Sequence, residues 1–304
     1  MSEWLDDLNP EQRRAVLHRD GHLLIVAGAG SGKTRTLACR VARLLAEGVR
    51  PERILLLTFS RRASREMLAR AARLAEVQGA RRVWGGTFHA VANRLLRRHG
   101  AAVGLRCGFT VLDQGDHVDL LGLVRHDLEL GEQGRRFPKK QTLASIYSRV
   151  VNAQLPLADL VERSYPWCRD DLEGIRTVFA GYLERKRAHN VVDYDDLLLY
   201  WRALAASGSV GPLLRSSFDH ILVDEFQDTN AVQADIVVAM AGPGVQVAAV
   251  GDDAQAIYGF RSGSARHMVE FPDRFPGSSV VTLDRNYRST PAILATANAV
   301  MAGS

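Results

Sequence analysis

The glycine-rich stretch Ala27–Thr34, with the sequence AGAGSGKT, constrains this chain more than any other segment. The apolar run Leu23–Val26 precedes it and a helical pattern, Thr34–Glu47, follows. Small residues between a strand and a helix let backbone N–H groups approach phosphate at the helix N-terminus. We expect Lys33 to reach the β- and γ-phosphates of a nucleotide and the Thr34 hydroxyl to bind Mg²⁺. A glycine-rich turn with an incidental lysine is the alternative, and the flanking strand and helix argue against it.

Short apolar runs recur along the chain, and several are continuous rather than alternating, which is typical of buried parallel strands. They are Leu23–Val26, Ile54–Thr58, Val83–Thr87, Ile221–Val223, Val245–Val250 and Val280–Leu283. Helical patterns follow the first three runs, at Thr34–Glu47, Arg61–Glu76 and Phe88–His99. This alternation predicts an α/β fold in which a parallel sheet is flanked by helices.

The strand–helix rhythm breaks from about Gln114 to Phe218. A structureless loop of that length is implausible inside a compact domain. Apolar residues at Leu172, Ile175 and Phe179 keep helical spacing. The stretch therefore predicts an inserted all-helical subdomain.

The composition excludes several classes of protein. The chain has 304 residues, of which 46% are hydrophobic and 24% are charged, so it is globular and has the length of about two domains. No apolar run approaches the roughly 18 residues that cross a bilayer, so no membrane partner is expected. Its 3 cysteines are far apart and form neither a disulfide framework nor a metal spacing. With an acidic N-terminus that is no signal peptide, these features predict a cytoplasmic protein.

Charge is unevenly distributed along the chain. Residues 1–110 carry 20 Lys and Arg against 9 Asp and Glu, whereas residues 111–304 carry 19 against 25. Within residues 61–106 there are 11 Arg and 2 Glu. Such a concentration indicates a polyanion partner such as nucleic acid. On charge alone, solvated outer faces of arginine-rich helices are an equally good interpretation.

Two adjacent carboxylates, Asp224 and Glu225, follow the apolar run Ile221–Val223. Ligands bind beyond the carboxyl ends of strands in an open α/β sheet. There Asp224 would hold Mg²⁺, and Glu225 would orient or deprotonate an attacking water. No Asn-Lys-x-Asp element is present for guanine, so we expect adenine. Gln12 is a candidate to contact it, although the local sequence favours a helix-capping role.

A further cluster, Gly251–Arg261, follows the run Val245–Val250. Gln255 in this cluster is placed to sense a γ-phosphate. Tyr258, Phe260 and Arg261 are suited to stacking on bases and gripping phosphates. The local sequence slightly favours the alternative that the aromatic residues belong to the core.

Taken in order, these motifs resemble the N-terminal half of UvrD/Rep/PcrA-type superfamily 1 DNA helicases. The segments that carry the resemblance are Leu8–Gln12, Ala27–Thr34, Thr58–Ala63, Gly86–His89, Asp193–Leu197, Val223–Asn230, Gly251–Arg261 and Asn286–Thr290. Departures include Arg62 in place of a usual lysine and Ala254 in place of a usual acidic residue.

The resemblance implies ATP and Mg²⁺ as cofactors and assigns a role to each matching residue. It implies catalytic roles for Lys33, Asp224, Glu225, Gln255 and Arg288, and metal binding by Thr34 and Asp224. It implies nucleotide binding by Gln12, Ala27, Gly28, Ala29, Gly30, Ser31, Gly32, Lys33, Thr34, Arg35, Tyr287 and Arg288. It implies contacts with single-stranded DNA from Phe59, Arg62, His89, Tyr258, Phe260 and Arg261.

The same resemblance implies a domain plan. A RecA-like ATP-binding domain 1A is expected at 1–110 and 190–280, a helical subdomain 1B at 111–189, and the start of a truncated second RecA-like domain 2A at 281–304. The expected activity is that of an ATP-dependent 3′–5′ helicase acting on DNA with a 3′ single-stranded tail, with DNA-repair proteins as further partners. The alternatives are an ATP- and DNA-binding module without motor activity, and the helicase part of a RecB/AddA-like helicase–nuclease.

Overall fold

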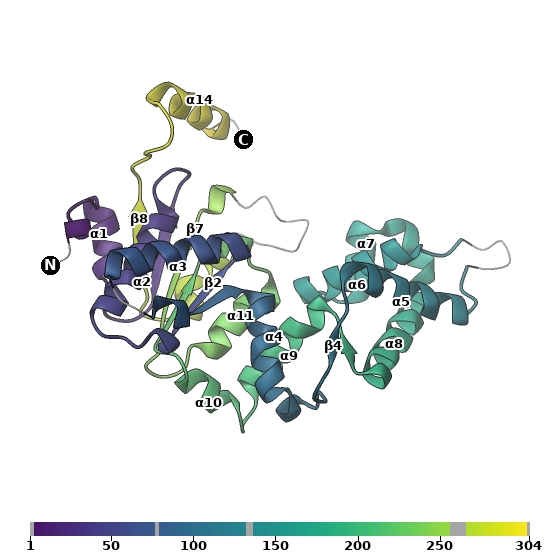
Figure 1. Ribbon diagram of the computed structural model, residues 1–304. Coiled ribbons are helices and arrows are strands. Elements are labelled where there is room, and N and C mark those ends of the chain that lie inside the picture. The colour runs from purple at the N-terminus through teal and green to yellow at the C-terminus, as the bar shows by residue number, and fades with distance from the viewer. Residues whose placement is uncertain (1–2, 77–78, 132–135, 256–265, 303–304) are drawn as a thin grey trace.

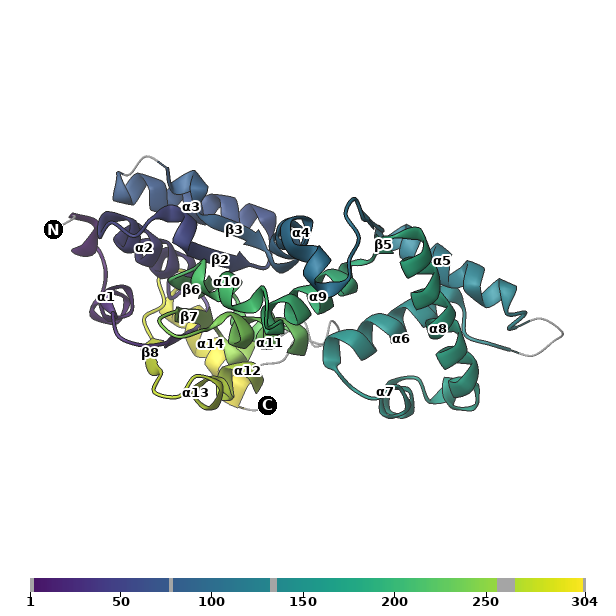
Figure 2. The same ribbon diagram turned by 90° about the horizontal axis from the view of Figure 1, so that it is seen from below.

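The computed structural model describes residues 3–76, 79–131, 136–255 and 266–302, which form two lobes (Figure 1). One lobe contains a parallel sheet with helices on both faces. The other is helical and projects from one side of the first, as the view from below also shows (Figure 2). The last helix, α14, stands away from the sheet at the top of Figure 1.

The main sheet has six strands in the order β3-β2-β6-β7-β1-β8, and neighbouring strands pair in parallel. Its strands are β1 Leu23–Ala27, β2 Ile54–Thr58, β3 Trp84–Thr87, β6 His220–Val223, β7 Gln246–Gly251 and β8 Ser279–Leu283. Both faces of the central strands are covered, which explains why their sequences are continuously apolar. The predicted α/β class and all six predicted strands are therefore confirmed, with ends that differ by at most one residue.

Successive strand residues contribute to two separate cores. Leu23 and Ile25 pack on one face with helices α1 Pro10–Leu17, α2 Lys33–Ala46 and α3 Arg61–Ala75. Leu24 lies in the core on the other face. The helices that cover that face are α4 Phe88–His99, α9 Tyr194–Ala206, α10 Gly211–Ser216, α11 Ala231–Met240, α12 Arg266–Val269 and α13 Phe271–Arg274.

The helical lobe has a core of its own, built from the apolar faces of four helices. These are α5 Gln114–Asp127, α6 Lys140–Ala153, α7 Leu157–Ser164 and α8 Leu172–His189. A short parallel pair that the sequence did not predict, β4 Thr110–Val111 and β5 Val191–Val192, lies where the chain enters and leaves the lobe. The last helix is α14 Pro291–Ala302. Among the described residues, no helix combines the length and apolarity needed to cross a membrane.

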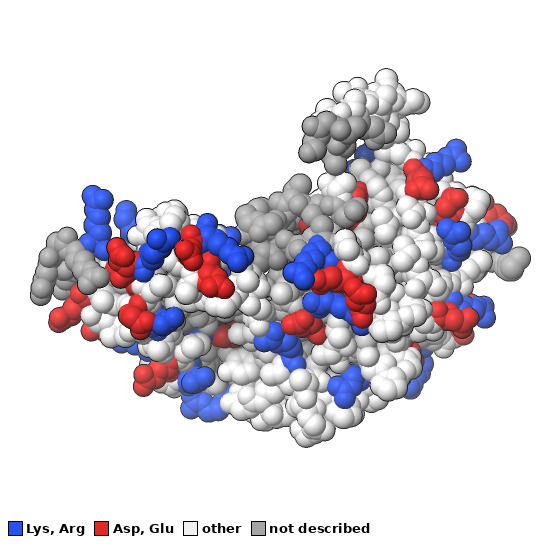
Figure 3. Space-filling model, turned by 180° about the vertical axis from the view of Figure 1, so that it is seen from behind, with Lys and Arg blue, Asp and Glu red and all other residues white. Residues whose placement is uncertain are grey.

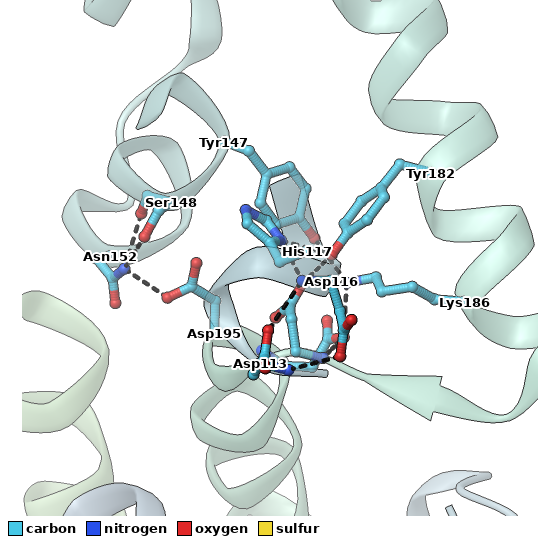
Figure 4. A network of polar contacts seen from close by, with 11 residues as sticks. Asp113, Asp116, His117, Tyr147, Ser148, Asn152, Tyr182, Lys186 and Asp195 are labelled. Carbon is cyan, nitrogen blue, oxygen red and sulfur yellow. Dashed lines mark hydrogen bonds and ion pairs between the residues drawn. The ribbon is translucent and has the colours of Figure 1, made fainter. Parts of the chain in front are cut away.

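A buried ionic network lies at the junction of the two lobes (Figure 4). Lys186 Nζ, on α8, donates to Asp193 Oδ2 and Asp196 Oδ2, each at 2.6 Å. Tyr182 Oη donates to the same Asp193 oxygen at 2.8 Å and lies 2.6 Å from His117 Nδ1. Lys186 is 3% exposed, so these charges are compensated by one another rather than by water. The network fixes α8 of the helical lobe against the start of α9.

Candidate functional site

The loop between β1 and α2 places backbone N–H groups at a helix N-terminus. Gly30 and Gly32 have φ values of 73° and 88°, a left-handed conformation that side chains other than glycine rarely adopt. Gly32 is the N-cap of α2 and makes no side-chain cap hydrogen bond. The Ser31 N–H and hydroxyl both donate to the Gly28 carbonyl, at 3.2 and 2.7 Å. The first N–H groups of α2 therefore remain available to an anionic ligand.

The loop is also closely packed by two distant segments. A Cβ atom on Gly32 would lie 2.7 Å from Gln12 Nε2, and one on Gly30 would lie 2.6 Å from the Arg288 Cβ. Asn286 Nδ2 donates to the Ala29 carbonyl at 2.6 Å, and the Tyr287 N–H donates to the Gly30 carbonyl at 2.9 Å. These glycines thus serve close approach as well as loop geometry.

Gln12 both caps its helix and reaches the loop. Asn9 and Gln12 form the reciprocal capping box that the sequence predicts, and Gln12 Nε2 also donates to the Ser31 carbonyl at 2.9 Å. Asn9 Nδ2 donates to the Tyr287 hydroxyl at 2.9 Å. The predicted residues Gln12 and Tyr287, 275 positions apart in the sequence, therefore lie on the same side of the loop.

The Lys33 ammonium group faces acidic and amide side chains at the carboxyl edge of the sheet. Lys33 Nζ lies 3.6 Å from Glu225 Oε2, 3.9 Å from Asp252 Oδ2 and 3.4 Å from Gln255 Oε1. Gln227 joins two of these groups, because its Nε2 donates to Glu225 Oε2 at 2.8 Å and its Oε1 accepts the Asp252 N–H at 3.0 Å. The structure thus brings together residues that follow β1, β6 and β7.

The two carboxylates after β6 have unusual environments. Glu225 has a φ of 50° and a ψ of 50°, a left-handed conformation that costs a non-glycine residue about 1–3 kcal/mol and is found preferentially at functional sites. Burial, and then the charge of Glu225, raises the pKa of Asp224 to about 7. The same two causes raise the pKa of Asp228 to about 6. Asp224 Oδ1 is buried and has no hydrogen-bond partner among the described residues.

This arrangement suits a divalent cation at Asp224. An ionised carboxylate with a buried, unpartnered oxygen is destabilised until a cation compensates it. Within the described ranges, no group of three or more His, Cys, Asp or Glu residues is arranged to hold a metal ion. Mg²⁺ does not require such a cage, since it is commonly bound by one or two carboxylates together with phosphate oxygens and water. Thr34, exposed in the first turn of α2, offers a hydroxyl at the same edge of the sheet.

A cavity of about 930 Å³, here called the interlobe cleft, extends from the carboxylates to the helical lobe. Its walls include two residues predicted to contact DNA, Phe59 and His89, and also Glu225 and Asp228. The Phe59 ring is 45% exposed. His89 packs edge-on against Tyr194, with 5.7 Å between ring centroids, and burial lowers its pKa to about 4, so it is uncharged near neutral pH.

The remaining predicted residues have varied positions. Arg62 is exposed and pairs with Glu66 at 2.7 Å, and Arg61 rather than Arg62 lines the interlobe cleft. Arg35 pairs with Asp7 at 3.7 Å. Arg288 is exposed beside the loop. The predicted DNA contacts Tyr258, Phe260 and Arg261 lie outside the described residues.

Part of the basic excess in residues 61–106 is used within the fold. The guanidinium groups of Arg94 and Arg98 lie over the Trp84 ring, and that of Arg97 lies 3.9 Å from the Phe109 ring centroid. The arginines of α3 lie on the front of the molecule in Figure 1. On the opposite face, positive and negative side chains are interspersed over both lobes (Figure 3).

Sequence reasoning did not single out every residue of this site. Gln227 and Asp252 connect the predicted groups, and Tyr194 and Asp195 line the interlobe cleft beside His89. All four lie in segments that carried the family resemblance, so their position next to the predicted residues was the available signal. No local pattern identified their contacts.

A glycine-rich loop after β1 and carboxylates after β6, at one edge of a parallel sheet flanked by helices, define the P-loop NTPase class of fold. Within that class the assignment is more specific. The family model of the UvrD/REP helicase N-terminal domain matches residues 8–276, and the chain belongs to this family.

Similar proteins carry the names of DNA helicases. The chain is 39% identical over 311 residues to ATP-dependent DNA helicase UvrD1 of Mycobacterium tuberculosis, covering 98% of this chain and 39% of that protein. It is 38% identical over 296 residues to ATP-dependent DNA helicase PcrA of Leuconostoc citreum, covering 97% and 39%. It is 36% identical over 309 residues to DNA helicase II of Escherichia coli, covering 99% and 41%. The chain spans about two fifths of the length of these relatives.

Proposed function

We propose that this chain is the N-terminal ATP-binding part of an ATP-dependent 3′–5′ DNA helicase of the UvrD type, which couples ATP hydrolysis to movement on single-stranded DNA. The observation that carries the proposal is the position of Lys33 between the loop and the side chains of Glu225, Asp252 and Gln255. A phosphate group that enters the loop would replace the carboxylates as the partner of this lysine.

The ATP site is proposed to consist of the loop and the segments packed on it. The residues of 27–34, with Arg35, would surround the phosphates, and Gln12 and Tyr287 would flank the adenine. Asn9 supports this arrangement, because its hydrogen bond to the Tyr287 hydroxyl brings that ring to the end of α1 where Gln12 lies. Arg288, next to Gly30, would contact the γ-phosphate.

Hydrolysis would place Glu225 as the group that orients water and accepts its proton. The water oxygen forms a bond to the γ-phosphorus as the bond between that phosphorus and the β–γ bridging oxygen breaks, and ADP leaves. Bound Mg²⁺, held by Thr34 and Asp224, would neutralise phosphate charge. Gln255, within reach of Lys33, is proposed to sense the γ-phosphate.

Single-stranded DNA is the proposed partner of the interlobe cleft. Phe59 and His89 support this proposal, because an exposed ring and an uncharged imidazole suit stacking on bases. Arg62, Tyr258, Phe260 and Arg261 are proposed as further DNA contacts from the family resemblance. The 3′ tail, the 3′–5′ direction and DNA-repair partners rest on that resemblance as well, and a DNA substrate fits a cytoplasmic location.

The proposed domain plan keeps the boundaries expected from the sequence. Domain 1A comprises 1–110 and 190–280, subdomain 1B comprises 111–189, and domain 2A begins at 281. The separate core of the helical lobe supports this division. A motor of this kind needs a second α/β domain that closes on the nucleotide.

Steady-state ATP hydrolysis with and without single-stranded DNA tests the proposal, with Glu225→Gln as the matched blank. We expect turnover that DNA increases. In the Glu225→Gln variant we expect a rate at least about a hundredfold lower and unchanged ATP binding, since an amide cannot accept the proton. Turnover that survives Glu225→Gln would contradict the role of Glu225. ATP and DNA binding without turnover would support the alternative, a binding module without motor activity.

A further inference from the structure

The last turn of α6 carries a side chain that links the helical lobe to the α/β lobe. Asn152 Nδ2 donates to Asp195 Oδ1, in the first turn of α9, at 2.7 Å. The same nitrogen lies 2.8 Å from the Ser148 carbonyl oxygen and 3.0 Å from Ser148 Oγ. Figure 4 displays Asn152 between Ser148 and Asp195. The helix itself thus orients the amide group toward α9.

The other end of the same amide contacts the segment that follows the candidate carboxylates. Asn152 Oδ1 accepts a hydrogen bond from Asn230 Nδ2 at 2.7 Å. Asn230 is 7% exposed and is the N-cap of α11, where its side chain accepts from the Gln233 N–H. One side chain therefore uses both its donor and its acceptor to join α6, α9 and α11.

The segment between Asn230 and Glu225 is internally bonded, so its parts are expected to move together. The Asp228 N–H donates to the Glu225 carbonyl at 2.9 Å, and Thr229 Oγ1 donates to the Phe226 carbonyl at 2.6 Å. Glu225 at its start has a left-handed backbone that its surroundings must hold. A displacement of Asn230 would therefore change the position of the Glu225 carboxylate.

At the other end, Asp195 reports on the interlobe cleft. It follows Tyr194, whose ring packs against His89, and both Tyr194 and Asp195 line the cleft. Burial, and then the charge of Asp193, raises the pKa of Asp195 to about 6, whereas the hydrogen bond from Asn152 lowers it. The bond to Asn152 is therefore charge-assisted when Asp195 is ionised, and such bonds are stronger than neutral ones.

We propose that Asn152 is a positioning residue through which single-stranded DNA in the interlobe cleft adjusts the segment that carries Glu225. DNA that contacts Tyr194 and His89 shifts the first turn of α9, and the Asp195–Asn152–Asn230 chain of hydrogen bonds transfers this shift to the start of α11. The inference rests on the proposed function and adds the route by which DNA regulates ATP hydrolysis.

The first test is the effect of Asn152→Ala on DNA-stimulated ATP turnover. We expect the ratio of stimulated to basal rates to fall about three- to tenfold, with basal turnover and DNA affinity unchanged within about twofold. Gln154→Asn is the matched control. Gln154 lies one residue beyond the same helix and accepts a hydrogen bond from Arg202 at 2.8 Å, so it joins α6 to α9 without reaching Asn230.

A reversed pair distinguishes a specific link from loss of structure. In the double variant Asn152→Asp with Asp195→Asn, the amide at position 195 can donate to the carboxylate at position 152, which can still accept from Asn230. We expect this variant to recover most of the DNA stimulation that Asn152→Asp alone loses. Failure of the exchange to restore stimulation would overturn the proposal.

Hydrogen–deuterium exchange supplies a readout that does not depend on turnover. Adding an oligothymidylate should slow exchange of the amides in residues 226–234 of the unchanged chain, and Asn152→Ala should abolish that change while DNA still binds. If DNA binds and stimulates the two proteins equally, the inference fails and the proposed function stands. If the unchanged chain neither binds nor responds to DNA, both fail.

Discussion

Lys33 illustrates how one residue depends on partners from the whole sheet edge. Its ammonium group is 10% exposed and faces Glu225 and Asp252 without a hydrogen bond to either. The carboxylates are close enough to hold the lysine near the loop, yet too distant to compete strongly with phosphate oxygens. This geometry is what a site needs if its lysine must exchange partners when ATP binds.

At the scale of the residue, we predict that Lys33→Ala weakens ATP binding at least about tenfold, equivalent to about 1.4 kcal/mol, because it removes the mobile cation of the loop. Calorimetric titration with ATP and Mg²⁺ measures this change. Lys139→Ala removes the same charge from an exposed position at the start of α6 and should leave the affinity unchanged. Equal ATP affinity in the Lys33→Ala protein would refute the assignment of the loop.

Elements meet at this site because the loop glycines permit close contact. Residues that follow β8 lie directly on the loop, where Asn286 and Tyr287 bond to loop carbonyls. The helix α1 contacts the other side through Gln12. A loop with larger side chains would keep both elements away from the phosphates.

At the scale of the element, Gly30→Ala should lower the free energy of unfolding by more than the roughly 1 kcal/mol that its left-handed backbone costs. The added Cβ would lie 2.6 Å from the Arg288 Cβ and displace the segment after β8. Gly48→Ala is the control, since Gly48 has a φ of 87° and nothing within 4 Å of an added Cβ. Urea unfolding and ATP titration of both variants measure the difference. Equal losses in the two would mean that the contact has no energetic consequence.

The whole molecule depends on how its two lobes are joined. Two polar features connect them: the buried network around Lys186 and the bridge made by Asn152. The first is ionic and fully buried, whereas the second has one end at the cleft. Their different exposure suits one to fixing the joint and the other to responding to a ligand.

At this scale we predict that Lys186→Leu lowers the free energy of unfolding by about 3–5 kcal/mol, because two buried carboxylates, Asp193 and Asp196, lose their shared cation. Lys140→Leu breaks an exposed pair with Asp119 and should cost only about 0–1 kcal/mol. Chemical denaturation of both variants measures the contrast. Similar costs would show that the Lys186 network is not effectively desolvated.

Much of the fold could be predicted because its signals are local. Continuous apolar runs predict the strands within one residue, and helices such as α4 begin and end at the predicted residues. The capping box at Asn9 was likewise readable from neighbouring residues. By contrast, β4 and β5 contain two residues each, too few for any period to be detected.

The site shows the same division between local and distant information. The sequence by itself determined the loop, its lysine and the carboxylate pair, because phosphate and metal chemistry require those residue types at fixed local spacing. Only the tertiary structure decided that Gln227 contacts Asp252, that Arg35 pairs with Asp7 and that Asn152 meets Asn230 across 78 positions. Such contacts depend on how the strands and lobes pack, and the side chains that make them are common polar residues with no distinguishing local pattern.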